Sequence, residues 1–72
     1  MKKSKKISKI SLVTLRKAKG LSQRELASDV MISSSAIAQY ESGSRNPTLE
    51  NALKIANYFN VPVENISFES KK

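Results

Sequence analysis

The stretch from Gln23 to Tyr40, QRELASDVMISSSAIAQY, constrains the fold of this chain more than any other. Its apolar and small residues are spaced so that a helix, a turn and a second helix would all face one core. They are Leu26, Ala27, Val30, Ile32, Ile37 and Tyr40. Ser22 and Glu25 match a capping box, in which each side chain accepts the other residue's backbone N–H at a helix start. The sequence therefore predicts two short helices joined by a tight turn, the first over Gln23–Val30.

This stretch resembles the helix-turn-helix of the Cro/phage-repressor family, also called the XRE family. The resemblance rests on LSQRELA, on SSSAIAQYESG at the expected distance and on the RNP that follows, and it covers about residues 10–68. It implies an all-α, five-helix, lambda-repressor-like DNA-binding domain. Met31 departs from the pattern, because the family commonly has glycine at this turn position. If the backbone has positive φ there, a residue other than glycine would destabilise the fold by on the order of 1 kcal/mol.

The remaining helices are expected on both sides of this motif. They run from Ser8 or Ser11 to Lys19, from a serine cap at Ser33 or Ser34 to Ser42, from Leu49 to Phe59, and over a short stretch within residues 61–68 that ends extended. Gly20 and Gly43 follow two of these helices and can take the left-handed conformation of a C-cap. The 49–59 helix has a wide apolar stripe that we expect to be core, formed by Leu49, Ala52, Leu53, Ile55, Ala56 and Phe59.

Composition narrows the classes of function. A chain of 72 residues without cysteine or histidine forms one small domain, and it excludes disulfides, thiolate metal sites and imidazole catalysis. We therefore expect no metal, no cofactor and no enzymatic activity. The sequence has no apolar run long enough to span a membrane and no secretion signal, so a cytoplasmic protein is expected.

The charge is strongly positive and uneven. The formal net charge is +7, and nine of the thirteen basic residues lie within residues 1–24. This favours a polyanionic partner, although charge alone does not choose among DNA, RNA and anionic lipid. We expect residues 1–9 to be a basic, flexible arm that either touches phosphates or only aids solubility. Residues 10–68 are expected to be the domain, and residues 69–72 a tail.

The resemblance assigns base contacts to the helix that follows the turn. Its first turns would enter the major groove of double-stranded DNA and bring side chains to base edges. Ser34, Ser35 and Gln39 match the family's base-contacting positions, and Ser33 matches a position beside the DNA backbone. The Gln39 amide could donate to adenine and accept from it at once. The alternatives are simple helix capping for the serines and a solvent-facing amide for Gln39.

Backbone contacts are expected on both sides of that helix. Gln23 stands at the positive end of its own helix, and the family uses this position to bind a phosphate. Arg45 and Asn46 follow the helix that ends at Ser42 and would contact the DNA backbone on its other side. Arg24 would add positive charge beside Gln23. For Gln23 the alternative is again an ordinary exposed amide.

Arg16 and Glu41 are charged residues within otherwise apolar surroundings. In the family, the matching residues form a partly buried ion pair that joins the first helix to the end of the third. We expect the same structural pair here. The alternative is two exposed charges that contribute little to stability.

Apolar residues near the C-terminus exceed what the core needs. Val63, Ile66 and Phe68 therefore predict a homodimer interface, although Ile66 could instead cover the first helix. The extended end could pair as a strand across the dimer.

The predicted function is a sequence-specific transcriptional regulator of double-stranded DNA. We expect a repressor, because no additional effector or activation domain is evident, and we expect it to bind a near-palindromic operator as a homodimer. No small-molecule effector is evident. The alternative is an antitoxin-like or other protein-interaction module whose DNA binding is secondary.

Overall fold

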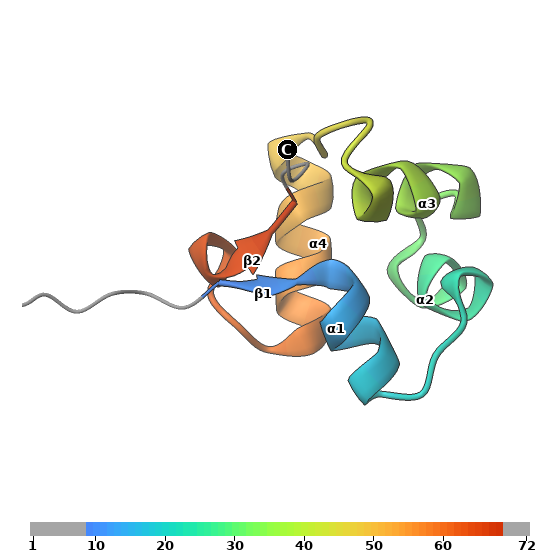
Figure 1. Ribbon diagram of the computed structural model, residues 1–72, viewed down its shortest axis with the longest axis horizontal. Helices are drawn as coiled ribbons and strands as arrows, with labels where there is room; N and C mark the ends of the chain where they lie inside the picture. Colours follow the sequence, from blue (N-terminus) through green and yellow to red (C-terminus); the bar gives the residue numbers. More distant parts are fainter. Residues whose placement is uncertain (1–8, 69–72) are drawn as a thin grey trace, which may run out of the picture.

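The computed structural model describes residues 9–68. The elements in chain order are β1 (Ile10–Ser11), α1 (Leu12–Ala18), α2 (Gln23–Val30), α3 (Ser34–Ser42), α4 (Leu49–Phe59), the 3₁₀ helix η1 (Val63–Asn65) and β2 (Ile66–Ser67). Figure 1 shows α2 and α3 together on one side of the molecule and the β1–β2 pair on the other. Apart from Lys9, the arm expected over residues 1–9 lies outside the described residues, as does the tail over 69–72.

A hydroxyl side chain starts each α-helix. Ser11, Ser22, Ser33 and Thr48 each accept the backbone N–H of the residue three positions later. Such a cap satisfies one of the N–H groups that have no partner within the helix. The capping box at the start of α2 is present in full, and the predicted bounds of α2 are confirmed. Of the two starts considered for α1, the structure has the serine cap at Ser11.

A residue with left-handed backbone conformation follows each α-helix. Gly20 and Gly43 have φ values of 74° and 80°, while Met31 and Asn60 both have φ of 61°. The positive φ predicted for Met31 is therefore confirmed. Because the Met31 side chain is 81% exposed, no apolar burial offsets the strain of this backbone.

The core lies between the helices. Its largest fully buried side chains are Tyr40, Leu12, Leu26, Ile37 and Ile55. The prediction that Leu49 and Leu53 are also core is wrong, because they are 71% and 42% exposed. These two leucines are one helical turn apart and form their own row on α4, beside the row that packs inward. A wide apolar stripe can thus hold one buried row and one exposed row.

The predicted count of five helices is also not matched, because residues 9–68 contain four α-helices. Residues 63–65 form a single 3₁₀ turn, and the chain then extends into β2. β2 pairs in parallel with β1, with Ile10 opposite Ile66 and Ser11 opposite Ser67. Pairing gives the backbone polar groups of this segment partners within the same chain, and β-branched Ile66 suits an extended backbone. The extended end, for which pairing across a dimer was one possibility, therefore pairs with β1 of its own chain.

Candidate nucleic-acid interface

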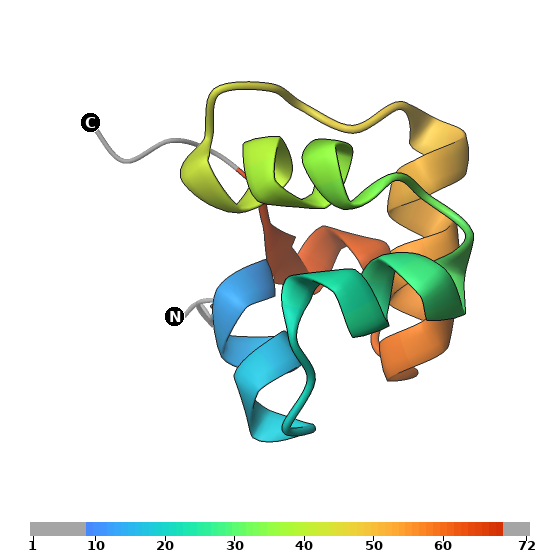
Figure 2. The same ribbon diagram turned by 90° about the vertical axis from the view of Figure 1, so that its right-hand side faces the viewer.

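The α3 helix has one buried face and one exposed face. Ala36, Ile37 and Tyr40 are buried, whereas Ser34 and Ser35 in its first turn are exposed. Figure 2 shows α3 and α2 on the same face of the molecule, with the loop that follows α3 turning back above it. The first turn of α3 is therefore accessible to a large ligand, and its exposed side chains are small hydroxyls.

Ser33 is the N-cap of α3. Its Oγ accepts the backbone N–H of Ala36 over 3.0 Å, and its own hydroxyl proton remains free to donate. The capping role and a contact to a DNA phosphate are therefore compatible.

Gln39 lies one turn after Ser35 on α3 and is half-buried. Its Oε1 accepts a hydrogen bond from Nη1 of Arg45 over 2.9 Å. The Arg45 guanidinium also lies over the ring of Tyr40, with 6.0 Å between Cζ and the ring centroid. Sequence reasoning gave Gln39 and Arg45 separate roles, and only the path of the loop between them brings them together.

Gln23, the first residue of α2, is half-buried, and its amide has a partner within the protein. Its Nε2 donates to Oε1 of Glu41 over 2.8 Å. No pattern in the sequence indicates this hydrogen bond. It leaves the second Nε2 hydrogen and Oε1 for another partner.

Arg16 and Glu41 connect α1 to the end of α3. Arg16 Nε donates to Glu41 Oε2 over 2.6 Å and Nη2 to Oε1 over 3.2 Å, while Nη1 donates to the carbonyl of Leu21 over 2.7 Å. The two side chains are 12% and 5% exposed. The hydrogen bond to Glu41 raises the pKa of Arg16 against the opposing effect of burial. Together with the hydrogen bond from Gln23, these contacts fix the end of α3 relative to the last turn of α1 and the start of α2.

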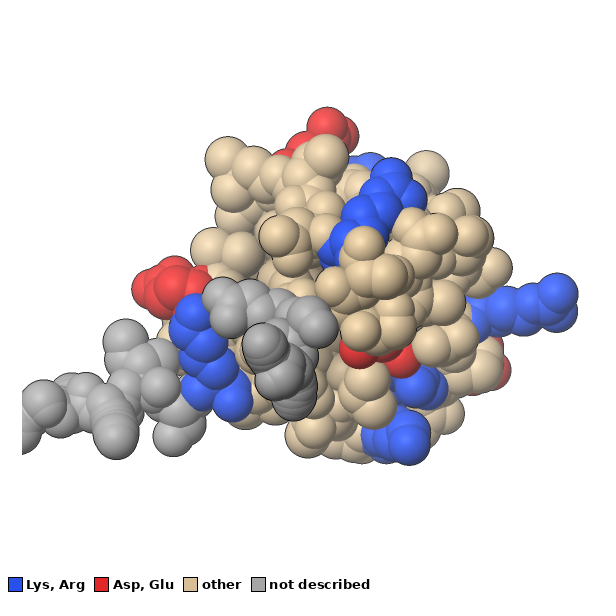
Figure 3. Space-filling view, turned by 45° about the horizontal axis from the view of Figure 1, so that its top comes forward, with Lys and Arg blue, Asp and Glu red and all other residues tan. Residues whose placement is uncertain are grey.

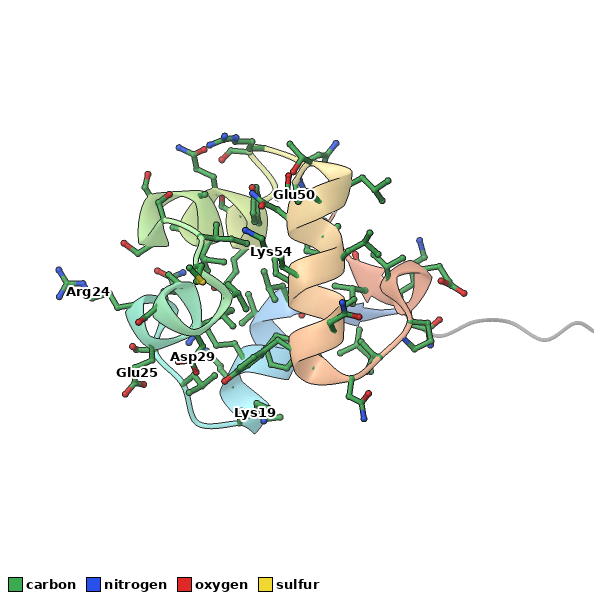
Figure 4. The ribbon with its side chains drawn as sticks, turned by 180° about the vertical axis from the view of Figure 1, so that it is seen from behind. Lys19, Arg24, Glu25, Asp29, Glu50 and Lys54 are labelled. Carbon is green, nitrogen blue, oxygen red and sulfur yellow. The ribbon has the colours of Figure 1, made fainter. Side chains whose placement is uncertain are left out.

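The surface charge of the described part of the chain is mixed. Residues 9–68 contain seven basic and five acidic residues, so six of the thirteen basic residues lie outside this range. Figure 3 shows Lys and Arg at separate points of one face, with Asp and Glu between some of them. Arg24 projects outward from α2, away from the rest of the molecule (Figure 4). Much of the chain's positive charge therefore belongs to its two ends.

A groove of about 340 Å³ lies between α4, the loop before it and β2. Its lining residues are Lys9, Asn46, Pro47, Leu49, Ala52, Val63, Ile66, Ser67 and Phe68. Val63 and Phe68 are half-buried, so both lie at this groove with part of their surface open. Ile66 is only 3% exposed and packs in the core, so its side chain already has its contacts within one chain.

Two further features of residues 9–68 bear on function. No helix in this range is both long enough and apolar enough to cross a membrane. Within the same range, the side chains that commonly bind metal ions form no cluster.

A comparison with protein families agrees with this geometry. The α2 and α3 helices are joined by a short turn in which Met31 has a left-handed backbone conformation, and the first helical turn of α3 is exposed. This arrangement is that of a helix-turn-helix domain, a DNA-binding module. A helix-turn-helix family model matches residues 12–66, which is most of the chain. The chain therefore belongs to the Cro/C1-type (XRE) helix-turn-helix family. No curated protein was found to match it.

Proposed function

We propose that this protein is a sequence-specific transcriptional regulator that binds double-stranded DNA as a homodimer and represses transcription. One observation carries the proposal: α3 buries Ile37 and Tyr40 while its first turn, with Ser34 and Ser35, stays exposed. A major groove accepts an α-helix that enters with its N-terminal turns. Bound there, the domain would exclude other proteins from the same DNA, which is the simplest route to repression.

In this proposal, Ser34, Ser35 and Gln39 face the bases. Ser35 and Gln39 are four residues apart, so they share one face of α3. Serine can both donate and accept, so the two serines would discriminate weakly or through water. Gln39 would then contribute most of the direct readout.

Contacts to the DNA backbone would come from both ends of the motif. Gln23 and Ser33 lie at the N-termini of α2 and α3, where free backbone N–H groups favour a phosphate. Arg24 is exposed beside Gln23, and Arg45 and Asn46 are exposed after α3. These residues would fix the register of α3 and supply affinity.

The groove beside α4 is the proposed dimer interface. Leu49 exposes apolar surface at this groove, which Val63 and Phe68 also line, and burial of this surface by a second copy would be favourable. Asn46 lines the same groove, so the interface would adjoin the loop that holds DNA. A symmetric pair of domains would present two α3 helices to a near-palindromic site.

The same groove favours a second candidate function. A different protein could occupy it, and DNA binding would then be secondary to that interaction, as in an antitoxin-like module. Such a module would show weak site preference and would remain monomeric without its partner.

Selection of bound sites from random duplexes tests the proposal. We expect recovered sites with two similar half-sites and an affinity that falls steeply with salt. Ser35→Glu should abolish selection, because it places a carboxylate where α3 would meet the groove while remaining compatible with a first helical turn. Asn57→Glu adds the same charge at an exposed position of α4 and serves as the matched control. Recovery of no preferred sequence would contradict the proposal.

A further inference from the structure

We propose that Arg45 is a positioning residue for Gln39, and that the pair reads DNA as one unit that selects guanine. The inference rests on the proposed function, because it names the base that α3 reads. It differs from the role expected for Arg45, which was a contact to the DNA backbone alone.

The contact between the two side chains fixes which way the Gln39 amide faces. Arg45 Nη1 lies 2.9 Å from Gln39 Oε1. A guanidinium has only donors, so the carboxamide atom that faces it must be the oxygen. Nε2 is on the other side of the carboxamide and therefore points away from Arg45. The free polar group that Gln39 offers is thus its NH₂.

The loop after α3 brings Arg45 to this position. Gly43, with φ of 80°, reverses the chain at the end of α3. Ser44 N–H and the Ser42 hydroxyl then donate to the carbonyl oxygen of Gln39, over 3.1 Å and 3.2 Å. The loop is therefore tied to the same turn of α3 that contains Gln39, and Arg45 follows one residue later.

A fixed aromatic ring restrains Arg45 from a second direction. The Arg45 Cζ atom lies 6.0 Å from the centroid of the Tyr40 ring, at the outer limit for a cation–π contact. Tyr40 is only 2% exposed, and its hydroxyl accepts a hydrogen bond from Nδ2 of Asn51 on α4 over 3.0 Å. Because this ring cannot move freely, it favours one position of the guanidinium and, through it, one orientation of Gln39.

This arrangement changes which base the pair prefers. A free glutamine matches adenine, since it can accept from N6 and donate to N7. Here Arg45 occupies one lone pair of Gln39 Oε1 and places positive charge beside it, so accepting from an adenine amino group is disfavoured. The remaining donors of Gln39 and Arg45 instead match the two major-groove acceptors of guanine, N7 and O6.

Site selection with three variants tests the inference. The wild-type chain should select guanine at the position that loses its preference in Gln39→Ala. Arg45→Met should shift the relative preference toward adenine by about tenfold, within the range that one bidentate contact supplies. Arg24→Met removes the same charge without touching Gln39, so it should weaken all sequences alike and leave the preferred base unchanged. Adenine selected by the wild type, or one base preference shared by the wild type and Arg45→Met, would overturn the inference.

A measurement without DNA separates this inference from the proposed function. In the free protein, Arg45→Met should shift the side-chain amide resonances of Gln39 and leave those of Gln23, which is bonded to Glu41, in place. Unmoved Gln39 resonances would overturn the inference even if the wild type selects a site. A wild type that selects no site would overturn the proposed function, and the inference with it.

Discussion

Arg16 and Glu41 are 25 residues apart in sequence, yet Arg16 Nε lies 2.6 Å from Glu41 Oε2. Gln23 Nε2 donates to the same carboxylate, at Oε1. This one carboxylate therefore holds α1, the start of α2 and the end of α3 together. Both ion-pair partners are nearly buried, so the arrangement depends on each charge having its partner.

Loss of either partner should destabilise the domain strongly. We expect Arg16→Met or Glu41→Gln to lower the free energy of unfolding by about 3 kcal/mol, because the remaining charged partner stays nearly buried without an opposite charge beside it. Urea denaturation measures this change, with exposed Glu64→Gln as the control. The double variant should lose less than the sum of the two single losses. A single loss below about 1 kcal/mol would mean that the pair behaves as a surface pair.

Relief of backbone strain at Met31 should stabilise the domain. Met31→Gly should raise the free energy of unfolding by up to about 1 kcal/mol, because glycine adopts positive φ freely and little apolar burial is lost. Asn60 has the same φ of 61°, but asparagine tolerates this backbone better, so Asn60→Gly is the matched control with a smaller expected gain. Equal thermal stability of Met31→Gly and Asn60→Gly would contradict the strain argument.

The two predicted backbone contacts at α2 should differ in their salt dependence. Arg24→Ala should reduce the slope of log affinity against log salt by about one, because one cation fewer displaces counterions. Gln23→Ala should weaken all sequences alike with an unchanged slope, because its amide is uncharged. Gel-shift titrations at several salt concentrations measure both effects. A reduced slope in Gln23→Ala would argue against a direct amide contact with the phosphate.

The exposed leucines of α4 should control dimer formation. Leu49→Lys should raise the dimer dissociation constant about tenfold or more, since a charge replaces apolar surface that the partner would bury. Sedimentation equilibrium measures this constant. Met31→Lys makes the same change at an exposed apolar residue outside the groove, and it should leave the dimer dissociation constant unaltered. A dimer of undiminished strength in Leu49→Lys would place the interface elsewhere.

Tyr58 should titrate above the usual range of tyrosine. Its hydroxyl donates to Oδ2 of Asp29 over 2.6 Å, and this bond is the main reason that its pKa is raised, followed by burial and the negative charges of Asp29 and Glu25. Because the folded pKa is raised, the stabilisation is fully present below the ordinary tyrosine pKa and is lost as pH rises through the folded one.

Absorbance of the tyrosinate ion measures this titration. Asp29→Ala should move the pKa of Tyr58 back toward its ordinary value. Lys19 lies over the same ring, with 5.2 Å between Nζ and the centroid, and Figure 4 shows Lys19, Asp29 and Glu25 at one corner of the molecule. Lys19→Met is therefore the comparison variant, because it removes the charge over the ring and leaves the hydrogen bond to Asp29 intact. An unchanged titration in Asp29→Ala would contradict this account.

Local patterns in the sequence determined the helix-turn-helix and its boundaries. The capping box of Ser22 and Glu25, the spacing of Leu26, Ala27 and Val30, and the strained turn at Met31 all concern residues within a few positions of one another. Hydrogen bonds and apolar faces within one helix depend on short-range spacing, which a sequence displays directly.

Tertiary structure decided the features that depend on where separate segments meet. The pairing of β2 with β1, the exposure of Leu49 and Leu53, and the bond between Gln39 and Arg45 follow from the paths of loops and the limited area of the core. A sequence pattern shows that a residue is apolar or can donate a hydrogen bond. It does not show which residue will contact it in the folded protein, because that depends on how the whole chain packs.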